Sequence, residues 1–221
     1  MARRAAQTIR RAYDLLFAAF GPQGWWPAET RDEVLIGAVL TQNTSWKNVE
    51  RAIRALRDAD RITLDRIRRT PPDRLATLIR SSGTHRVKAG RLRALATWVE
   101  ERFAGDLDRL FAAGLPAARQ ELLRVPGVGP ETADAILLYA GNLPTFVVDA
   151  YTRRVLRRHH LIAASDGYGA VQALFERALP TVPALYGEYH ALLVEVGKQY
   201  CRKRARCRTC PLATLPHDPD L

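Results

Sequence analysis

The chain has 221 residues, enough for one large domain or two small lobes with a buried core. Hydrophobic residues make up 47% of it, which argues against a disordered chain. The 34 lysines and arginines against 23 aspartates and glutamates give a net charge of +11, which favours a polyanionic partner, DNA or RNA before a membrane surface. A charge excess that only aids solubility is the alternative.

The first twenty residues superficially resemble a signal peptide. However, Asp14 interrupts a short apolar stretch, and arginines recur at helical spacing, so an amphipathic helix fits better. No uncharged apolar run approaches the roughly 18 residues of a membrane span. The three cysteines cluster near the C-terminus in an odd number, which is not a secreted disulfide pattern. We expect a soluble, cytoplasmic and nucleoid-associated monomer.

In chain order, apolar periodicity and Gly/Pro punctuation predict helices and no persistent strand. Thr30 is the expected cap of the second helix, and Asn43 or Thr44 that of the third. A short extended run is expected at 143–148. The fold class is therefore all-α, with one lobe over 30–140 and a second lobe from 1–29 plus 141–221. The expected helices span 5–20, 31–40, 45–58, 62–68, 72–81, 86–103, 106–112, 116–124, 130–140, 149–157, 168–178 and 184–199.

The most specific local signal is LLRVPGVGPETADAILLYA, residues 122–140. Gly127 and Gly129 flank Val128 between two helical patterns, and glycines permit a tight turn. The second helix starts near Pro130, so its first amides point out of the turn and form an anion site that suits a DNA phosphate. Val125 and Val128 would hold the hairpin together. An ordinary connection between two helices is the alternative.

Four further segments join this motif: LIGAVLTQNTSWKNVERAI, SSGTHRVKAGRL, PTFVVDAYTRRVL and CRKRARCRTCPL. Together with the hairpin they resemble the endonuclease III superfamily of helix-hairpin-helix DNA glycosylases, over about residues 30–212. The resemblance implies a two-lobed helix-hairpin-helix glycosylase fold with a C-terminal cysteine loop. It also implies a partner, double-stranded DNA with a damaged base, and an enzyme that flips the nucleotide into a cleft between the lobes.

The resemblance places the family's catalytic aspartate at Asp149, in FVVDAY. The position suits the chemistry, because Asp149 opens a helix whose dipole and free amides favour the ionised carboxylate. That carboxylate could stabilise an oxocarbenium-like sugar and help orient a water. A plain aspartate N-cap is the alternative.

Members of the family that also cleave the strand carry a lysine in the hairpin's second helix, two residues after the last glycine. The matching residue here is Glu131, whose carboxylate cannot form a Schiff base. Asp149 lies 18 residues further on, which is the family's own interval. This departure predicts a monofunctional glycosylase that uses water.

The segment GWWPAETRDEVLIGAVLTQNTSW, with Glu131 in place of the lysine, resembles the 3-methyladenine DNA glycosylase branch. The resemblance implies a base pocket lined by aromatic side chains, because indole faces hold electron-poor alkylated purines. The alternative makes the two adjacent tryptophans core or interface anchors. The expected pocket residues are Trp25, Trp26, Pro27, Trp46 and Lys198.

The same resemblance implies DNA contacts along the hairpin lobe. Gln42 matches a position that probes the gap left by the flipped base, although a structural amide or a helix cap is an equal alternative. Thr84 occupies the place of a wedge, and Lys88, Arg153 and Arg154 are candidates for phosphate contact, with solvated surface charge as the alternative. The full set of expected DNA-binding residues is Gln42, Thr84, Lys88, Val125, Gly127, Val128, Gly129 and Thr132.

The cysteines Cys201, Cys207 and Cys210 read C-x5-C-x2-C, whereas the family pattern C-x6-C-x2-C-x5-C binds a 4Fe-4S cluster. The fourth position holds a proline, with His217 and Asp218 beside it. A cluster with a non-cysteine fourth ligand, a Cys3His zinc site and an empty loop all stay open. Five arginines and lysines within residues 202–208 predict a phosphate-binding surface.

The leading hypothesis is a monofunctional glycosylase for alkylated, 3-methyladenine-type bases. A bifunctional endonuclease III-type glycosylase and AP lyase for oxidised pyrimidines, or an adenine-mismatch glycosylase, is the alternative on the same fold. A catalytically silent protein that binds DNA structure is the alternative of a different class, and retention of Asp149 argues against it.

Overall fold

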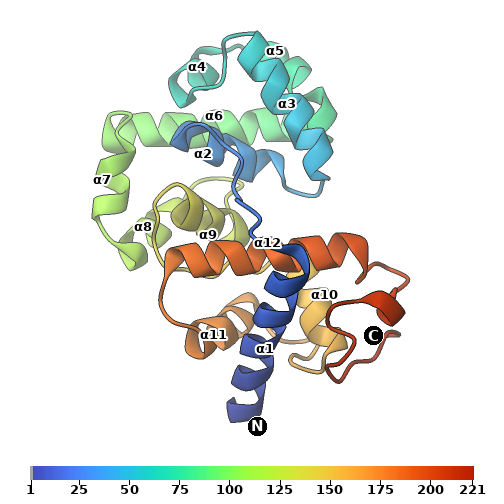
Figure 1. Ribbon diagram of the computed structural model, residues 1–221. Helices are drawn as coiled ribbons and strands as arrows, with labels where there is room; N and C mark the ends of the chain where they lie inside the picture. The colour runs from blue at the N-terminus through green and yellow to red at the C-terminus, as the bar shows by residue number, and fades with distance from the viewer. Residues whose placement is uncertain (1) are drawn as a thin grey trace. The chain divides into compact units, whose positions relative to one another are not determined.

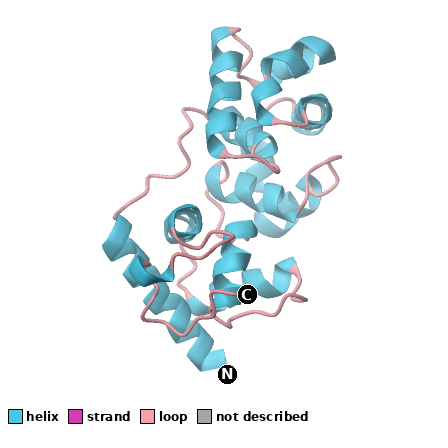
Figure 2. Ribbon diagram, turned by 90° about the vertical axis from the view of Figure 1, so that its right-hand side faces the viewer, coloured by secondary structure: helices cyan, strands magenta, loops and turns pink. Residues whose placement is uncertain are grey.

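A computed structural model describes residues 2–221, which form twelve α-helices, two short 3-10 turns and no strand (Figures 1 and 2). Each helix overlaps one predicted range, and the all-α fold class is confirmed. The chain divides into two compact units. We call residues 27–143 the hairpin unit, and residues 1–26 with 144–221 the terminal unit; the expected lobe boundaries were 30 and 140.

The hairpin unit is organised around its longest helix. That helix, α6, contacts α2, α4, α5 and α7, while α2 also packs on α9 and α8 pairs with α9. Almost every residue of α2 is buried, so this short apolar helix forms the centre of the unit. The helices are α2 (Arg31–Leu40), α3 (Trp46–Asp58), α4 (Leu64–Arg69), α5 (Pro72–Leu78), α6 (His85–Phe103), α7 (Leu107–Ala112), α8 (Leu115–Leu122) and α9 (Pro130–Tyr139).

Two helix starts test the expected caps. The Thr30 hydroxyl accepts a hydrogen bond from the Glu33 amide at 3.2 Å, so Thr30 is the N-cap of α2, as predicted. The N-cap of α3 is Ser45, which corrects the expectation of Asn43 or Thr44. Asn43 adopts a left-handed conformation with φ 53° and belongs to the preceding turn, a conformation that asparagine tolerates better than most residues.

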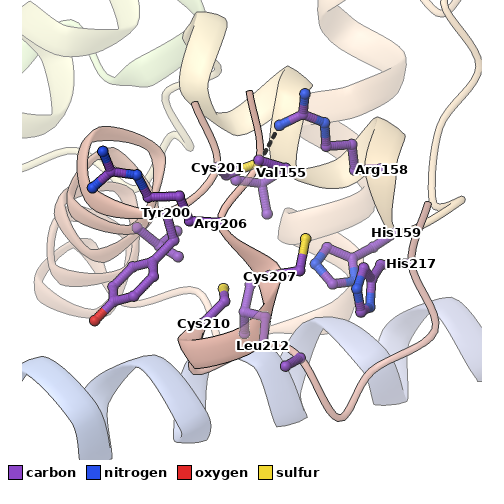
Figure 3. A pocket seen from close by; sticks show the side chains of 13 residues that line it. Val155, Arg158, His159, Tyr200, Cys201, Arg206, Cys207, Cys210, Leu212 and His217 are labelled. Atoms are coloured by element: carbon purple, nitrogen blue, oxygen red, sulfur yellow. Dashed lines mark hydrogen bonds between the residues drawn. The ribbon is translucent and has the colours of Figure 1, made fainter. Parts of the chain in front are cut away.

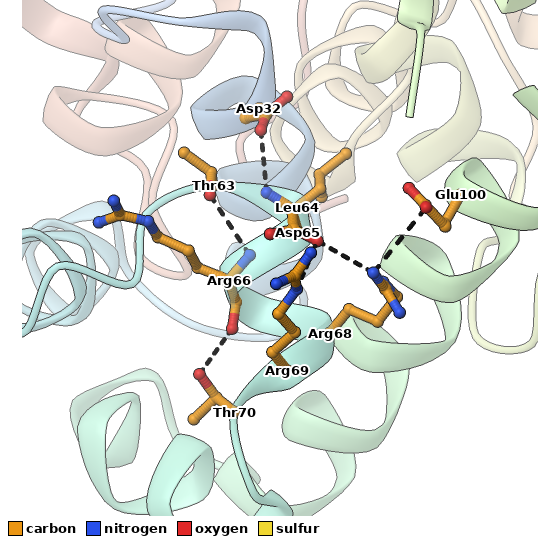
Figure 4. A network of polar contacts seen from close by, with 9 residues as sticks. All are labelled: Asp32, Thr63, Leu64, Asp65, Arg66, Arg68, Arg69, Thr70 and Glu100. Carbon is orange, nitrogen blue, oxygen red and sulfur yellow. Dashed lines mark hydrogen bonds and ion pairs between the residues drawn. The ribbon is translucent and has the colours of Figure 1, made fainter. Parts of the chain in front are cut away.

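A polar network fixes the start of α4 against its neighbours (Figure 4). The Leu64 amide donates to the carboxylate of Asp32 on α2 at 2.9 Å. Asp65 accepts from the guanidinium groups of Arg68 and Arg69 at 3.0 and 2.9 Å. Backbone groups that a six-residue helix leaves unsatisfied thus find partners on side chains.

The terminal unit combines both ends of the chain. Its helices are α1 (Ala2–Phe20), α10 (Ala150–Arg158), α11 (Tyr168–Ala178) and α12 (Pro183–Gln199). Helix α1 packs on α11 and α12, and α10 packs on α12. Phe146 stacks on Phe175 with ring centroids 3.8 Å apart, and both rings meet Tyr189 edge-on. The Tyr189 hydroxyl donates to the Ile9 carbonyl at 2.8 Å, which joins α12 to α1.

Across residues 2–221, no helix combines the length and the apolar character needed to cross a bilayer.

Candidate functional site

A tight turn joins α8 to α9 in the hairpin unit. Gly127 has φ +87°, a conformation that disfavours any residue with a Cβ, and the Val128 amide donates to the Val125 carbonyl at 3.0 Å. Helix α9 starts at Pro130 after Gly129, with no side chain capping its amino end. The amino end of α9 therefore lies at the turn where the motif places an anion site, and phosphate binding there stays a prediction.

Two side chains brace this turn from elsewhere in the unit. The Gln42 side-chain amide donates to the Gly127 carbonyl and to the Thr132 hydroxyl, each at 3.0 Å. The Arg91 guanidinium in turn donates to the Gln42 side-chain oxygen. The sequence singled out Gln42 but not Arg91, because a contact between residues 49 positions apart has no local signal.

A buried ion pair joins the two helices of the hairpin. Arg119 on α8 donates to both carboxylate oxygens of Asp134 on α9, at 2.7 and 3.2 Å. The Asp134 side chain is fully buried. Its signal in the sequence is a carboxylate between the apolar residues Ala133 and Ala135, since a buried charge must be paired.

The other expected DNA-binding residues differ in exposure. Thr84 and Gly127 are exposed, whereas the side chains of Val125, Val128 and Thr132 are buried, so only their backbones could meet DNA.

The expectation that Lys88 contacts phosphate is corrected by its burial. Its side chain is only 1% exposed, and its ammonium donates to the carbonyls of Leu40 at 2.8 Å and Ser82 at 2.5 Å. Burial, and then the nearby charge of Arg91, lower the pKa of Lys88 to about 8. Lys88 therefore joins α6 to the C-terminal end of α2.

In the terminal unit, Asp149 is the N-cap of α10. One carboxylate oxygen accepts from the Thr152 amide at 2.7 Å, and the other lies 3.8 Å from Nε2 of His190 on α12. Both side chains are nearly buried, at 13% and 8% exposure. Burial alone would raise the pKa of Asp149, but His190 and the Thr152 amide outweigh it, and the pKa lies below its ordinary value.

This geometry is compatible with both interpretations of Asp149, the catalytic carboxylate and the helix N-cap. The carboxylate caps a helix and is also held ionised beside a buried imidazole. His190 was not singled out from the sequence, because it lies in an unremarkable apolar stretch 41 residues from its partner.

Three of the five expected pocket residues lie together in the terminal unit. The rings of Trp25 and Trp26 are half-buried, with centroids 5.3 Å apart. The Lys198 ammonium lies 5.8 Å above the Trp25 ring, within range of a cation–π contact. Pro27 and Trp46 belong to the hairpin unit, where Pro27 is exposed and Trp46 is half-buried at the start of α3.

The three cysteines line one small hollow in the terminal unit, together with His159 and His217 (Figure 3). Arg158 donates to Sγ of Cys201 at 3.3 Å. Burial, and the charges of the other two cysteines, raise the pKa of Cys210. Within residues 2–221, no three His, Cys, Asp or Glu side chains gather closely enough to hold a single metal ion.

The two histidines at the hollow make similar contacts. Nδ1 of His159 bonds the Pro216 carbonyl at 2.9 Å, and Nδ1 of His217 bonds the Leu215 carbonyl at 2.8 Å. Asp218 is not among the lining residues, and its carboxylate instead accepts from the Asp220 amide. Of the two expected candidates for a fourth ligand, only His217 therefore faces the cysteines.

The arginines of this unit fall into two groups. Arg153 donates to the Asp166 carbonyl at 2.6 Å, and Arg154 donates to the carbonyls of Cys201 and Gly197, so both are held by backbone groups. By contrast, the five basic residues of the cysteine loop are all exposed, so their charges can reach a phosphate backbone. These residues are Arg202, Lys203, Arg204, Arg206 and Arg208.

The family model for the HhH-GPD superfamily of base excision DNA repair proteins matches residues 36–181, which include the hairpin and Asp149. The chain belongs to this superfamily. As an HhH-GPD protein, it is a DNA repair glycosylase, and the predicted family and fold are confirmed.

Three similar proteins place it within the superfamily. A provisionally assigned DNA repair glycosylase of Methanocaldococcus jannaschii is 44% identical over 213 residues, covering 93% of this chain and 94% of the relative. A crystal structure of the Helicobacter pylori 3-methyladenine DNA glycosylase bound to 1,N6-ethenoadenine is 30% identical, with TM-score 0.75, and covers 88% and 97% of the two chains. A non-covalent endonuclease III–DNA complex is 25% identical, with TM-score 0.82, and covers 96% and 94%.

Proposed function

We propose that this HhH-GPD glycosylase is monofunctional and hydrolyses the N-glycosidic bond of alkylated bases, with Asp149 as the catalytic carboxylate. The observation that carries the proposal is the setting of Asp149, nearly buried and ionised between the Thr152 amide and His190. A fixed negative charge stabilises the positive charge that develops on the sugar as the base leaves.

The chemistry then needs little else from the protein. An N-alkylated purine is already a good leaving group, so a strong general acid is dispensable. The remaining task is to hold a water for attack on the sugar, and an ionised carboxylate can orient that water and accept its proton.

The absence of a lysine at the family's nucleophile position supports hydrolysis over strand cleavage. Glu131 stands at the family's lysine position, and its carboxylate cannot form an imine. Lys88 is buried and bonded to two carbonyls, and Lys198 lies over Trp25. The other two lysines, Lys47 and Lys203, are exposed on the surface.

The two tryptophans of the terminal unit, Trp25 and Trp26, support the proposal that the substrate is an alkylated base. Trp25 and Trp26 present indole rings that could stack on an electron-poor purine, a contact worth about 0.5–1.5 kcal/mol beyond burial. The structurally similar H. pylori protein is a 3-methyladenine glycosylase with a modified adenine bound. The Lys198 ammonium already lies over the Trp25 ring, where a cationic base would also bind. The release of neutral and cationic lesions should therefore be compared directly.

We also propose that the cysteine hollow holds a 4Fe-4S cluster. The donor set fits, because three thiols and the His217 imidazole line one cavity. A zinc ion needs all its ligands within about 2.3 Å of one point, whereas a cluster binds each thiolate to a different iron. When bound, the cluster would fix the basic loop, and it would be detected by iron and sulfide analysis and by absorption near about 400 nm.

A panel of duplexes tests the function, with 3-methyladenine, 7-methylguanine, 1,N6-ethenoadenine and an oxidised pyrimidine as lesions. We expect base release from alkylated purines, strand breaks only after alkali, and no covalent adduct trapped by borohydride. Asp149→Asn should abolish release while duplex affinity changes only a few-fold. Asp106→Asn is the control for loss of an aspartate cap, since the exposed Asp106 carboxylate caps α7 by accepting from the Asp108 amide. A trapped adduct, or normal turnover by Asp149→Asn, would overturn the proposal.

A further inference from the structure

The hairpin turn owes its fixed geometry to a chain of contacts that starts outside the hairpin. The Gly127 carbonyl and the Thr132 hydroxyl both accept from Nε2 of Gln42. Gln42 itself follows the buried helix α2, and its side-chain oxygen accepts from Arg91 on α6. Helices α2 and α6 therefore both support the turn through the side-chain amide of Gln42.

We propose that Arg91 is a positioning residue that holds the hairpin turn in its phosphate-binding form, acting through Gln42. The proposal rests on the proposed function, since it takes the hairpin turn as the part of this glycosylase that binds DNA phosphates. It assigns Arg91 a role that neither the motif nor the resemblance supplies.

The first argument is the direction of the Gln42 amide. A glutamine side chain has one accepting end and one donating end, and it can turn over if nothing distinguishes them. Arginine has only donors, so Arg91 fixes the oxygen toward itself. The NH2 group must then face Gly127 and Thr132, where it finds two acceptors. Arg91 and the Gly127 carbonyl thus favour the same orientation of the amide, and loss of Arg91 leaves the carbonyl to hold it without that second constraint.

The second argument is the path of the Arg91 side chain. A Cβ built on Gly127 would lie 2.6 Å from Cδ and 2.7 Å from Nε of Arg91, closer than non-bonded atoms approach. The aliphatic stem therefore covers the face of the turn where other residues would carry a side chain. Gly127 is required for its φ of +87° and also for the space that Arg91 fills.

An arginine beside a phosphate-binding turn invites the simpler interpretation that it contacts phosphate directly. Salt dependence separates the two roles. Removing one phosphate contact lowers the slope of log affinity against log salt by about 0.9, whereas removing a positioning residue weakens binding without changing the slope. Arg86 is exposed on the same helix and provides a control of equal charge.

The experiment compares Arg91→Met, Arg91→Lys and Arg86→Met with the wild type, all as the full chain. In the free protein, hydrogen exchange of the hydrogen-bonded turn amides of Val125 and Val128 should accelerate in Arg91→Met and not in Arg86→Met. Affinity for an undamaged duplex should fall about tenfold in Arg91→Met, as expected when a charge-assisted hydrogen bond is removed, with the wild-type salt slope. Arg91→Lys keeps the stem and one charge and should show a smaller decrease, which keeps the test available if Arg91→Met does not fold.

Unchanged exchange in both Arg91 variants would overturn the positioning role, and a reduced salt slope would replace it with direct phosphate contact. Failure of the proposed function looks different. If the wild-type protein does not bind DNA through the hairpin, exchange still responds to Arg91→Met, while no hairpin variant alters the affinity.

Discussion

Lys88→Met tests the energetics of a buried cation in the hairpin unit. Lys88 is only 1% exposed, and its ammonium donates to the carbonyls of Leu40 and Ser82. Burial, followed by the charge of Arg91, lowers its pKa from 10.5 to about 8. Methionine keeps most of the length of the side chain and removes the titrating group together with its two hydrogen bonds, so the pH dependence of the difference in stability isolates the electrostatic contribution.

The magnitude and sign follow from proton linkage. Below pH 8 both the folded and the unfolded protein carry the proton, and the folded state bears the full cost of the buried charge. At about 1.4 kcal/mol per pH unit, lowering the pKa from 10.5 to about 8 corresponds to about 3 kcal/mol. Between about pH 8 and 10.5 the unfolded chain binds more protons, so the contribution of Lys88 to stability rises with pH and is complete above 10.5.

Urea unfolding of the wild type and of Lys88→Met at about pH 7, 9 and 10.5 measures this contribution. The free energy of unfolding of the wild type, minus that of the variant, should increase by about 3 kcal/mol across the range. Lys47→Met is the control for the loss of one exposed lysine. A difference that stays constant with pH for Lys88→Met would refute the reasoning.

Three further outcomes are expected. His190→Phe removes the group that lowers the pKa of Asp149, so the acidic limb of the pH profile for base release should move to higher pH; an unmoved limb would show that His190 does not act on the carboxylate. Gly129→Ala should fold normally, because its φ is −95° and a Cβ meets open space, yet it should weaken binding to all duplexes alike in a titration, since phosphate contacts carry no sequence information. Asp134→Ala removes the carboxylate that accepts two hydrogen bonds from Arg119 and should destabilise the protein by about 1.5–3 kcal/mol in urea unfolding, with an unchanged free energy of unfolding arguing against the ion pair.

Much of the molecule could be predicted from local patterns. The helices follow from apolar periodicity and from Gly/Pro punctuation, and the hairpin follows from one motif whose glycines and proline each have a physical reason. Asp149 could be placed at the start of a helix because it follows a buried apolar run, and in the structure it is the N-cap of α10. In each case the cause lies within a few residues of its effect.

The rest of the site depends on contacts between distant segments. Arg91 and His190 gain their roles from partners 49 and 41 residues away, and no local pattern marks them. Lys88 shows the opposite difficulty, because a lysine in a basic segment is typical of a DNA-binding surface. Only the packing of α6 against α2 reveals that its ammonium ends on two carbonyls.

The division of the chain also bears on how the protein is made. The hairpin unit is one continuous segment, whereas the terminal unit needs residues from both ends of the chain. On the ribosome, the apolar side of α1, with Ile9 and Leu16 fully buried in the finished fold, has no partner until α11 and α12 have been synthesised. At about 5–20 residues per second, that interval lasts on the order of 10–30 s. The nascent chain therefore exposes the apolar side of α1 during this interval, and transiently exposed apolar surface makes incompletely folded chains prone to aggregate.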